Sequence, residues 1–242
     1  MDMNFEYKPV DEEGLEILDV ISAATKFNNW MYNTVAPFCT GRTLEIGSGV
    51  GNISSFFVRD KKDIFLSDIR ENYRNILKNK FKLDNDHVLD IDIALPDFKE
   101  RYAAMLGTFD SVFALNVVEH IENDSLAIEN MLHLLKPGGQ VTVLVPAHQA
   151  LYNGIDKSLE HFRRYNKRSL SELMSKFAPV KNLFYFNGTG ILAWWIGGKL
   201  FSHKTIPEGE MKLYNTFVPV FKLIDKITMN RIGLSVVCVI RK

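Results

Sequence analysis

The sequence has little cysteine and no excess of charge. Only two cysteines, Cys39 and Cys238, occur in 242 residues, and they lie too far apart to match a metal-binding spacing. We therefore expect free thiols in a reducing compartment. Basic and acidic residues both number 29, so the formal net charge is zero. Without a net positive charge to attract phosphates, we expect no nucleic-acid partner.

Long apolar runs are also missing. No stretch reaches the roughly 20 residues of a transmembrane helix, and the first residues, Met-Asp-Met-Asn-Phe-Glu, do not resemble a secretory signal. We therefore expect a cytoplasmic protein without a membrane span. Hydrophobic residues make up 46% of the chain and charged residues 24%, which is enough to bury one core. We expect a single domain over residues 1–242.

A glycine-rich segment, Leu44–Ser54, is the most informative part of the chain. The apolar run Thr43–Ile46 predicts a buried strand that ends in a tight turn, and Ile53–Val58 predicts the start of a helix. Glycines let a backbone turn sharply and approach a ligand, which the free N–H groups of the helix would face. The dinucleotide pattern Gly-x-Gly-x-x-Gly would need glycine where Asn52 stands, which disfavours a nicotinamide-dependent oxidoreductase.

Further predicted strands end in polar residues. Asp63–Leu66 is followed by Asp68, about 20 residues beyond the glycines, where a carboxylate can accept ribose hydroxyls. The alternative role for Asp68 is a helix N-cap. His87–Ile91 predicts a third strand, and Phe109–Leu115 predicts a fourth. Because ligands of open α/β sheets bind at the carboxyl ends of the strands, these ends predict one shared site.

Residues 116–145 complete this pattern. Asn116 follows the fourth strand, and Glu119-His120 comes shortly afterwards. A helix is expected from about Asp124 to Leu135, and Lys-Pro-Gly-Gly at 136–139 predicts a turn before a fifth strand at 140–145.

These motifs together resemble those of class I S-adenosylmethionine (SAM) dependent methyltransferases. The similar features are an acidic residue two places before Gly-x-Gly-x-Gly, Phe-Asp-x-Val at the start of the fourth strand, the later Glu-His, and Leu-Leu-Lys-Pro-Gly-Gly. The resemblance covers residues 44–145 strongly. It implies an α/β, Rossmann-like fold: a seven-stranded, mostly parallel sheet with helices on both faces, an antiparallel last strand and a helical insertion before that strand.

The resemblance also implies SAM as the cofactor and assigns residues to it. Asp90 and Ile91 would meet the adenine, with Asp92 as a competitor for Asp90. The expected cofactor residues are Glu45, Gly47, Ser48, Gly49, Gly51, Asn52, Asp68, Ile69, Asp90, Ile91, Asn116 and Val117. Residues 1–40 would form a helical lid, residues 41–146 the SAM-binding half, and residues 147–242 the acceptor half, with the insertion at about 189–232.

After the fifth strand, Pro-Ala-x-x-x-Leu and His-x-Arg-Arg-Tyr resemble a methyltransferase subgroup, often bacterial, whose acceptors are mostly unspecified. The expected acceptor-binding residues are Trp30, Tyr152, Asp156, Arg163, Arg164 and Tyr165. Two interpretations of this loop stay open. An arginine fork suits a carboxylate or phosphate on the acceptor. Alternatively, Arg164 pairs with Asp156 and only fixes the loop.

The expected reaction is in-line methyl transfer to oxygen of a small-molecule, glycan or lipid-like acceptor. A hydroxyl acceptor needs a base, for which His148 is the first candidate and His120 and His161 are alternatives. One alternative is metal-assisted O-methylation through Glu119 and His120, with His148 as a third ligand. Methyltransferases that hold a divalent cation in this way have the motif Glu-x-x-Glu-His after the fourth strand. Asn116 stands where this motif has its first glutamate, so we expect no metal.

Another alternative is a SAM-binding subunit without catalysis, which the intact glycine motif and the polar loop disfavour. Residues 190–227 are rich in large apolar side chains with flanking lysines, a pattern that suits either capping of the acceptor site or contact with a membrane surface. The oligomeric state is left open.

Overall fold

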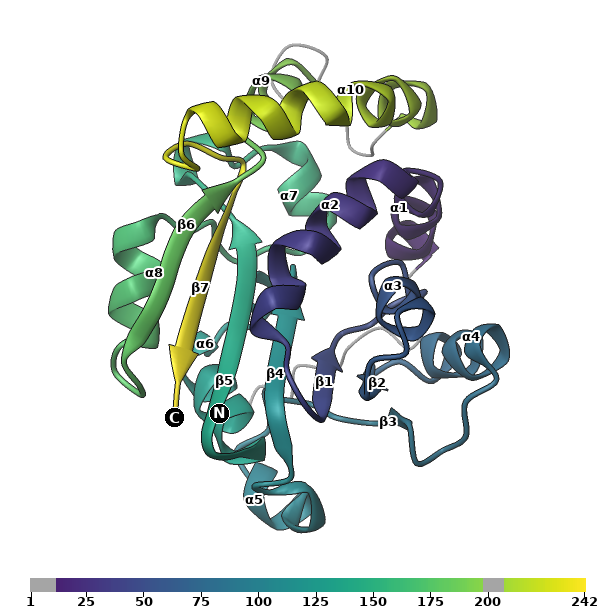
Figure 1. Cartoon of the computed structure of the whole chain (residues 1–242), viewed down its shortest axis with the longest axis vertical. Coiled ribbons are helices and arrows are strands. Elements are labelled where there is room, and N and C mark those ends of the chain that lie inside the picture. The colour runs from purple at the N-terminus through teal and green to yellow at the C-terminus, as the bar shows by residue number, and fades with distance from the viewer. Residues whose placement is uncertain (1–11, 198–206) are drawn as a thin grey trace.

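The computed structural model describes residues 12–197 and 207–242 of the chain. One sheet of seven strands runs through the molecule in the order β3-β2-β1-β4-β5-β7-β6 (Figure 1). Strands β1 to β5 are parallel, and β7 lies antiparallel between β5 and β6. The strands are β1 Thr43–Ile46, β2 Ile64–Ser67, β3 Val88–Leu89, β4 Phe109–Leu115, β5 Leu135–Pro146, β6 Val180–Phe186 and β7 Ser235–Arg241. This is the fold class expected from the sequence.

Helices cover both faces of the sheet. The helices are α1 Glu12–Ser22, α2 Thr25–Val35, α3 Ser54–Arg59, α4 Glu71–Phe81, α5 Phe98–Arg101, α6 Asp124–Leu134, α7 Gly154–Ser158, α8 Lys167–Met174, α9 Gly190–Trp195 and α10 Glu208–Ile227. Helices α5, α6 and α8 pack on one face, and α2, α3 and α10 contribute to the core on the other. Alternate residues of each strand serve the two cores because side chains alternate across a sheet. Thus Val112 belongs to one core and Phe113 to the other.

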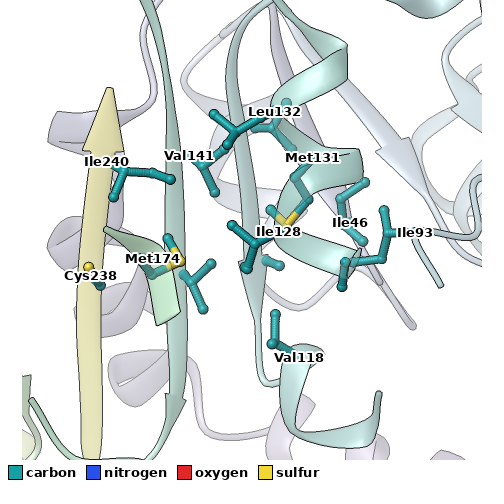
Figure 2. Packing of buried hydrophobic residues seen from close by; sticks show 14 of the residues in the cluster. Ile46, Ile93, Val118, Ile128, Met131, Leu132, Val141, Met174, Cys238 and Ile240 are labelled. Carbon is teal, nitrogen blue, oxygen red and sulfur yellow. The ribbon is translucent and has the colours of Figure 1, made fainter. Parts of the chain in front are cut away.

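The core between α6, α8 and the sheet is fully apolar where the strands are longest (Figure 2). Ile128 and Met131 of α6 and Met174 of α8 are completely buried together with Val141 of β5. Burying such a side chain stabilises a fold by about 1.5–3 kcal/mol relative to exposure. This packing fixes the central strands, whose carboxyl ends carry the candidate site.

Some local predictions need correction. The helical lid expected over 1–40 contains two α-helices in its described part, because the chain leaves helical geometry at Ala24 (ψ 61°). The turn expected at 136–139 lies inside β5, where the pairing with β4 shifts register between Phe109 and Ser111. The third strand is only two residues long. The outer part of the expected lid, residues 1–11, and residues 198–206 of the insertion lie outside the described residues.

Within the described part of the chain, no helix has the length and apolar composition needed to cross a membrane.

Candidate active site

The glycine turn after β1 requires glycine for packing as well as for conformation. Gly47 has φ +70°, and a Cβ added there would lie 2.5 Å from Cγ2 of Val117. Gly51 has φ +77°, and its added Cβ would lie 2.6 Å from the ring of Phe81. L-residues rarely adopt such positive φ values. Gly47 therefore faces the site, whereas Gly51 lets the turn pack on α4 and does not line the cavity described next.

A cavity of about 730 Å³ opens at the carboxyl ends of β1, β2 and β4. Its lining includes most of the cofactor residues expected from the sequence: Glu45, Gly47, Ser48, Gly49, Asn52, Asp68, Ile69, Ile91, Asn116 and Val117. Parallel strands bring these residues together because their carboxyl ends meet at one edge of the sheet. The size lies within the range of ordinary ligand sites.

Two buried carboxylates face this cavity. Glu45 accepts a short hydrogen bond from the Ser54 hydroxyl, and burial raises the pKa of Glu45 to about 7. Asp68 accepts from the backbone N–H groups of Gly49 and Arg70, each at 3.0 Å, and burial raises its pKa. A carboxylate has about four acceptor positions, so Asp68 retains capacity for a ligand. Both carboxylates therefore suit a ligand that carries hydrogen-bond donors or positive charge.

The adenine assignment to Asp90 is corrected by the structure. Ile91, Asp92 and Ile93 line the cavity, whereas Asp90 does not. The Asp90 side chain is 51% exposed and lies 3.3 Å from the Arg74 guanidinium. The reason is that β3 ends at Leu89, so the alternation of a strand no longer sets the direction of the Asp90 side chain. Asp92, the competitor named from the sequence, has the better position.

A network of buried charges lies at the part of the cavity that was expected from the sequence to face the acceptor (the acceptor side). Asp156 is fully buried and accepts from Nε of Arg164 at 2.7 Å and from Nδ1 of His161 at 2.9 Å. Burial raises the pKa of Asp156, but hydrogen bonds from His161 and Arg164 outweigh it and lower the pKa overall. Since the carboxylate can only accept, His161 donates through Nδ1. In the neutral ring, Nε2 then carries no proton and can accept one. His161 and Arg164 both line the cavity, and Asp156 holds them from behind.

His148, the first candidate for a catalytic base, does not line the cavity. It follows β5 with φ +64°, and its ring stacks on Tyr185 with centroids 5.1 Å apart. Its backbone N–H donates to the carbonyl of Tyr165. The sharp turn therefore places this ring against β6, and the other two candidates, His120 and His161, are the histidines at the cavity.

Several expected acceptor-binding residues lie outside the cavity lining and stabilise the loop. The Tyr152 hydroxyl donates to the His161 carbonyl at 2.6 Å. Arg163 lies 2.9 Å from Asp124, whose carboxylate also accepts from the Tyr165 hydroxyl.

Trp30 lies outside the cavity as well. It packs on the ring of Phe186 with centroids 4.6 Å apart. Of the six acceptor-binding residues expected, only Arg164 therefore lines the cavity.

Four residues that sequence reasoning missed complete the acceptor side: Asn187, Trp194, Met211 and Tyr214. The Tyr214 hydroxyl makes a short hydrogen bond to Asn187, and the Arg164 guanidinium lies 4.5 Å from the centre of the Trp194 ring. For Trp194, Met211 and Tyr214 the signal was the richness of residues 190–227 in large apolar side chains, which does not say which side chain lines a cavity. Asn187 precedes this segment and had no signal.

Glu119, His120 and His161 form a cluster whose possible ligand atoms all lie within 4.8 Å of one another. Glu119 is fully buried, and neither carboxylate oxygen has a hydrogen-bond partner in residues 12–197 and 207–242. Burial raises the pKa of Glu119 to about 8. The pKa of His120 is lowered to about 3, mainly by burial and to a smaller extent by the nearby His161. His148 is not part of this cluster, so the third ligand proposed for a metal is corrected to His161.

Comparisons with known proteins relate the chain to methyltransferases. Residues 44–141 match the family model of a methyltransferase domain. The chain is 26% identical over 145 residues to the ubiquinone biosynthesis O-methyltransferase of Ralstonia nicotianae, covering 58% of this chain and 53% of that protein. It is 26% identical over 110 residues to the ubiquinone/menaquinone biosynthesis C-methyltransferase UbiE of Vibrio cholerae, covering 43% of this chain and 40% of that protein. The chain thus spans about half the length of these relatives or less.

A SAM-dependent methyltransferase from Archaeoglobus fulgidus has the same fold. The two structures superpose with a TM-score of 0.61 at 14% identity, over 96% of this chain and all of the other. The chain therefore carries a class I SAM-dependent methyltransferase domain.

Proposed function

We propose that the protein transfers a methyl group from SAM to a hydroxyl oxygen of a small-molecule, glycan or lipid-like acceptor. One observation carries the proposal: a single cavity joins the buried carboxylates Glu45 and Asp68 to His161, which a third buried carboxylate holds. One of the similar proteins is named as an O-methyltransferase of ubiquinone biosynthesis, which supports an oxygen acceptor, whereas the other is named as a C-methyltransferase and does not.

The cofactor side of the cavity fits SAM. When bound, SAM supplies an electrophilic methyl group on a sulfonium sulfur that is already a good leaving group. It also carries an ammonium group. Burial without a cationic partner raises the pKa of Glu45, because it disfavours the ionised carboxylate. A cationic ligand would favour the ionised form and lower this pKa again. Asp68 would accept ribose hydroxyls, and Ile91 would pack against the adenine ring.

The residues of the acceptor side would then position the hydroxyl and accept its proton. His161 donates through Nδ1 to Asp156, so Nε2 is the nitrogen that can take the proton of the acceptor hydroxyl as its oxygen forms a bond to the methyl carbon. Asp156 fixes the tautomer and stabilises the charged ring. His120 is a weak base because its pKa is low. Alignment of the reacting groups supplies the rest of the rate enhancement.

A second candidate function is methyl transfer assisted by a divalent cation. The observation in its favour is the cluster of Glu119, His120 and His161 around a buried carboxylate without hydrogen bonds. One carboxylate and two imidazoles suit zinc or iron better than magnesium. In this case Asp156 would orient a ligating His161 instead of a catalytic base.

Calorimetry and turnover test the two candidates. SAM should bind wild type in preference to NAD, and Asp68→Ala should weaken SAM binding by roughly 10-fold or more, because hydrogen bonds to a charged group contribute about 1.5–3 kcal/mol. Labelled SAM is then offered with phenols, glycans and lipid-linked hydroxyls. Turnover that survives EDTA supports the base mechanism. Loss with EDTA and recovery with a divalent cation supports the second candidate, and binding of NAD instead of SAM contradicts both.

A further inference from the structure

Helix α10 has one face buried against the molecule and an apolar face that is exposed. Met211, Val218 and Asp225, spaced seven residues apart, are buried against the rest of the molecule. Two positions after each buried residue, about 200° around the helix axis, stand the apolar residues Leu213, Val220 and Ile227. These three side chains are 62%, 51% and 70% exposed. The helix therefore has one buried face, which carries Asp225 as well as apolar residues, and an opposite face that is apolar and exposed.

The exposed face belongs to a continuous region of the chain. All but one of the large hydrophobic side chains that are exposed in the described residues fall between positions 192 and 232; the exception is Phe162. We call the members the α10 patch: Leu192, Trp195, Leu213, Phe217, Val220, Leu223, Ile224, Ile227, Met229 and Ile232. Figure 1 shows α9 and α10 together at the top of the molecule, beyond the ends of the strands.

Beside the C-terminal part of the patch the exposed charges are of one sign, whereas Glu208 and Glu210 lie before Leu213, its first member on α10, and Lys212 pairs with Glu208. From position 213 to 232, the charged residues are Lys222, Lys226, Arg231 and Asp225, and Asp225 is buried with its carboxylate bonded to the backbone N–H groups of Asn187 and Gly188. On the helix circumference, Lys222 and Lys226 lie between the buried face and the exposed face. A strip of exposed apolar side chains with lysines along one border is the pattern of a helix that lies in the interface of an anionic membrane.

We propose that the α10 patch docks the protein on the surface of a bilayer that contains anionic lipid. The apolar strip would enter the boundary between headgroups and acyl chains, and Lys222, Lys226 and Arg231 would meet lipid phosphates. The inference rests on the proposed function and deepens it. The inner face of the same helix contributes Met211 and Tyr214 to the cavity, so docking would bring the acceptor side next to the lipid and favour a lipid-like acceptor.

Vesicle flotation with the full chain tests the proposal. Wild type should float with vesicles of phosphatidylcholine and phosphatidylglycerol in equal amounts, and much less with phosphatidylcholine alone. The triple variant Val220→Ser, Leu223→Ser, Ile227→Ser should lower partitioning by about 100-fold or more, because it removes most of the inserted apolar area. Melting curves of the variant confirm that it folds, since all three side chains point away from the core.

A charge variant separates local from overall electrostatics. Lys222→Glu with Lys226→Glu should lower binding to anionic vesicles by roughly 25-fold or more, since each basic residue near such a surface contributes about fivefold. Lys176→Glu with Lys181→Glu makes the same change in net charge beyond α8 and at the start of β6, and should have a small effect. An equal loss in both variants would show that only net charge matters and would overturn the proposal.

Two further results would also overturn it. One is the absence of flotation of wild type with either vesicle. The other is a concentration-dependent dimer in light scattering that the triple serine variant abolishes, since a second copy would then cover the patch. SAM calorimetry on the same samples separates the two proposals: SAM binding without flotation refutes only the docking surface, and no SAM binding refutes the proposed function.

Discussion

The strongest test of the acceptor loop is Asp156→Ala. The carboxylate of Asp156 is fully buried, and the Arg164 side chain that pairs with it is 1% exposed. Removing one partner of a buried pair leaves an unpaired buried charge and costs about 3–5 kcal/mol. For a chain of this size, 1 kcal/mol shifts the melting temperature by about 2–4 °C. We therefore expect Asp156→Ala to lower the melting temperature by roughly 6–20 °C in calorimetry, and Arg164→Ala to reduce it as well.

The matched control is Glu172→Ala, which breaks an Arg–carboxylate pair of similar length on the surface. Arg168 and Glu172 lie 2.8 Å apart, with side chains 88% and 63% exposed. Solvent screens such a pair, so its loss should leave the melting temperature nearly unchanged. Equal melting temperatures for Asp156→Ala and Glu172→Ala would refute the reasoning. Asp156→Ala combined with Arg164→Met should recover part of the loss, because no buried charge then stays unpaired.

The effect also has a defined pH dependence. The folded-state pKa of Asp156 lies below its ordinary value. The stability that this ionised group contributes is therefore present above the unfolded pKa of about 3.9 and is lost as the pH falls through the folded value. The difference in melting temperature between wild type and Asp156→Ala should be full at neutral pH and shrink below about pH 4.

Three further predictions concern the cavity. Asp92→Ala should weaken SAM binding in calorimetry and Asp90→Ala should not; the reverse order would restore the assignment to Asp90. Because the folded-state pKa of Glu119 is raised to about 8, wild type loses stability as the pH rises from about 4.5 to 8, and Glu119→Gln should lose less between pH 5 and 8 in melting curves. His161→Gln should lower the turnover number by about 100-fold or more, whereas His148→Gln should keep it, and equal turnover in both would remove His161 as the base.

The sequence by itself determined the cofactor half of the fold. Gly47 is required by a positive φ, which is a local need and visible in the pattern, whereas its close approach to the Val117 side chain is a tertiary contact. Asp68 follows a short buried strand at the expected distance, and the parallel pairing of β1 with β2 brings it to the glycines. Such features are predictable because strand alternation and turn chemistry operate over a few residues.

The arrangement of the loops after β3 and β5 was decided by tertiary structure. The sequence favoured His148 over His161 as the candidate base, but the turn after β5 places His148 against Tyr185 while Asp156 holds His161 at the cavity. Asp90 and Asp92 are two residues apart, and the early end of β3 leaves Asp92 and not Asp90 in the cavity lining. The physical reason is that loop side chains take their direction from long-range contacts and not from the period of their own segment.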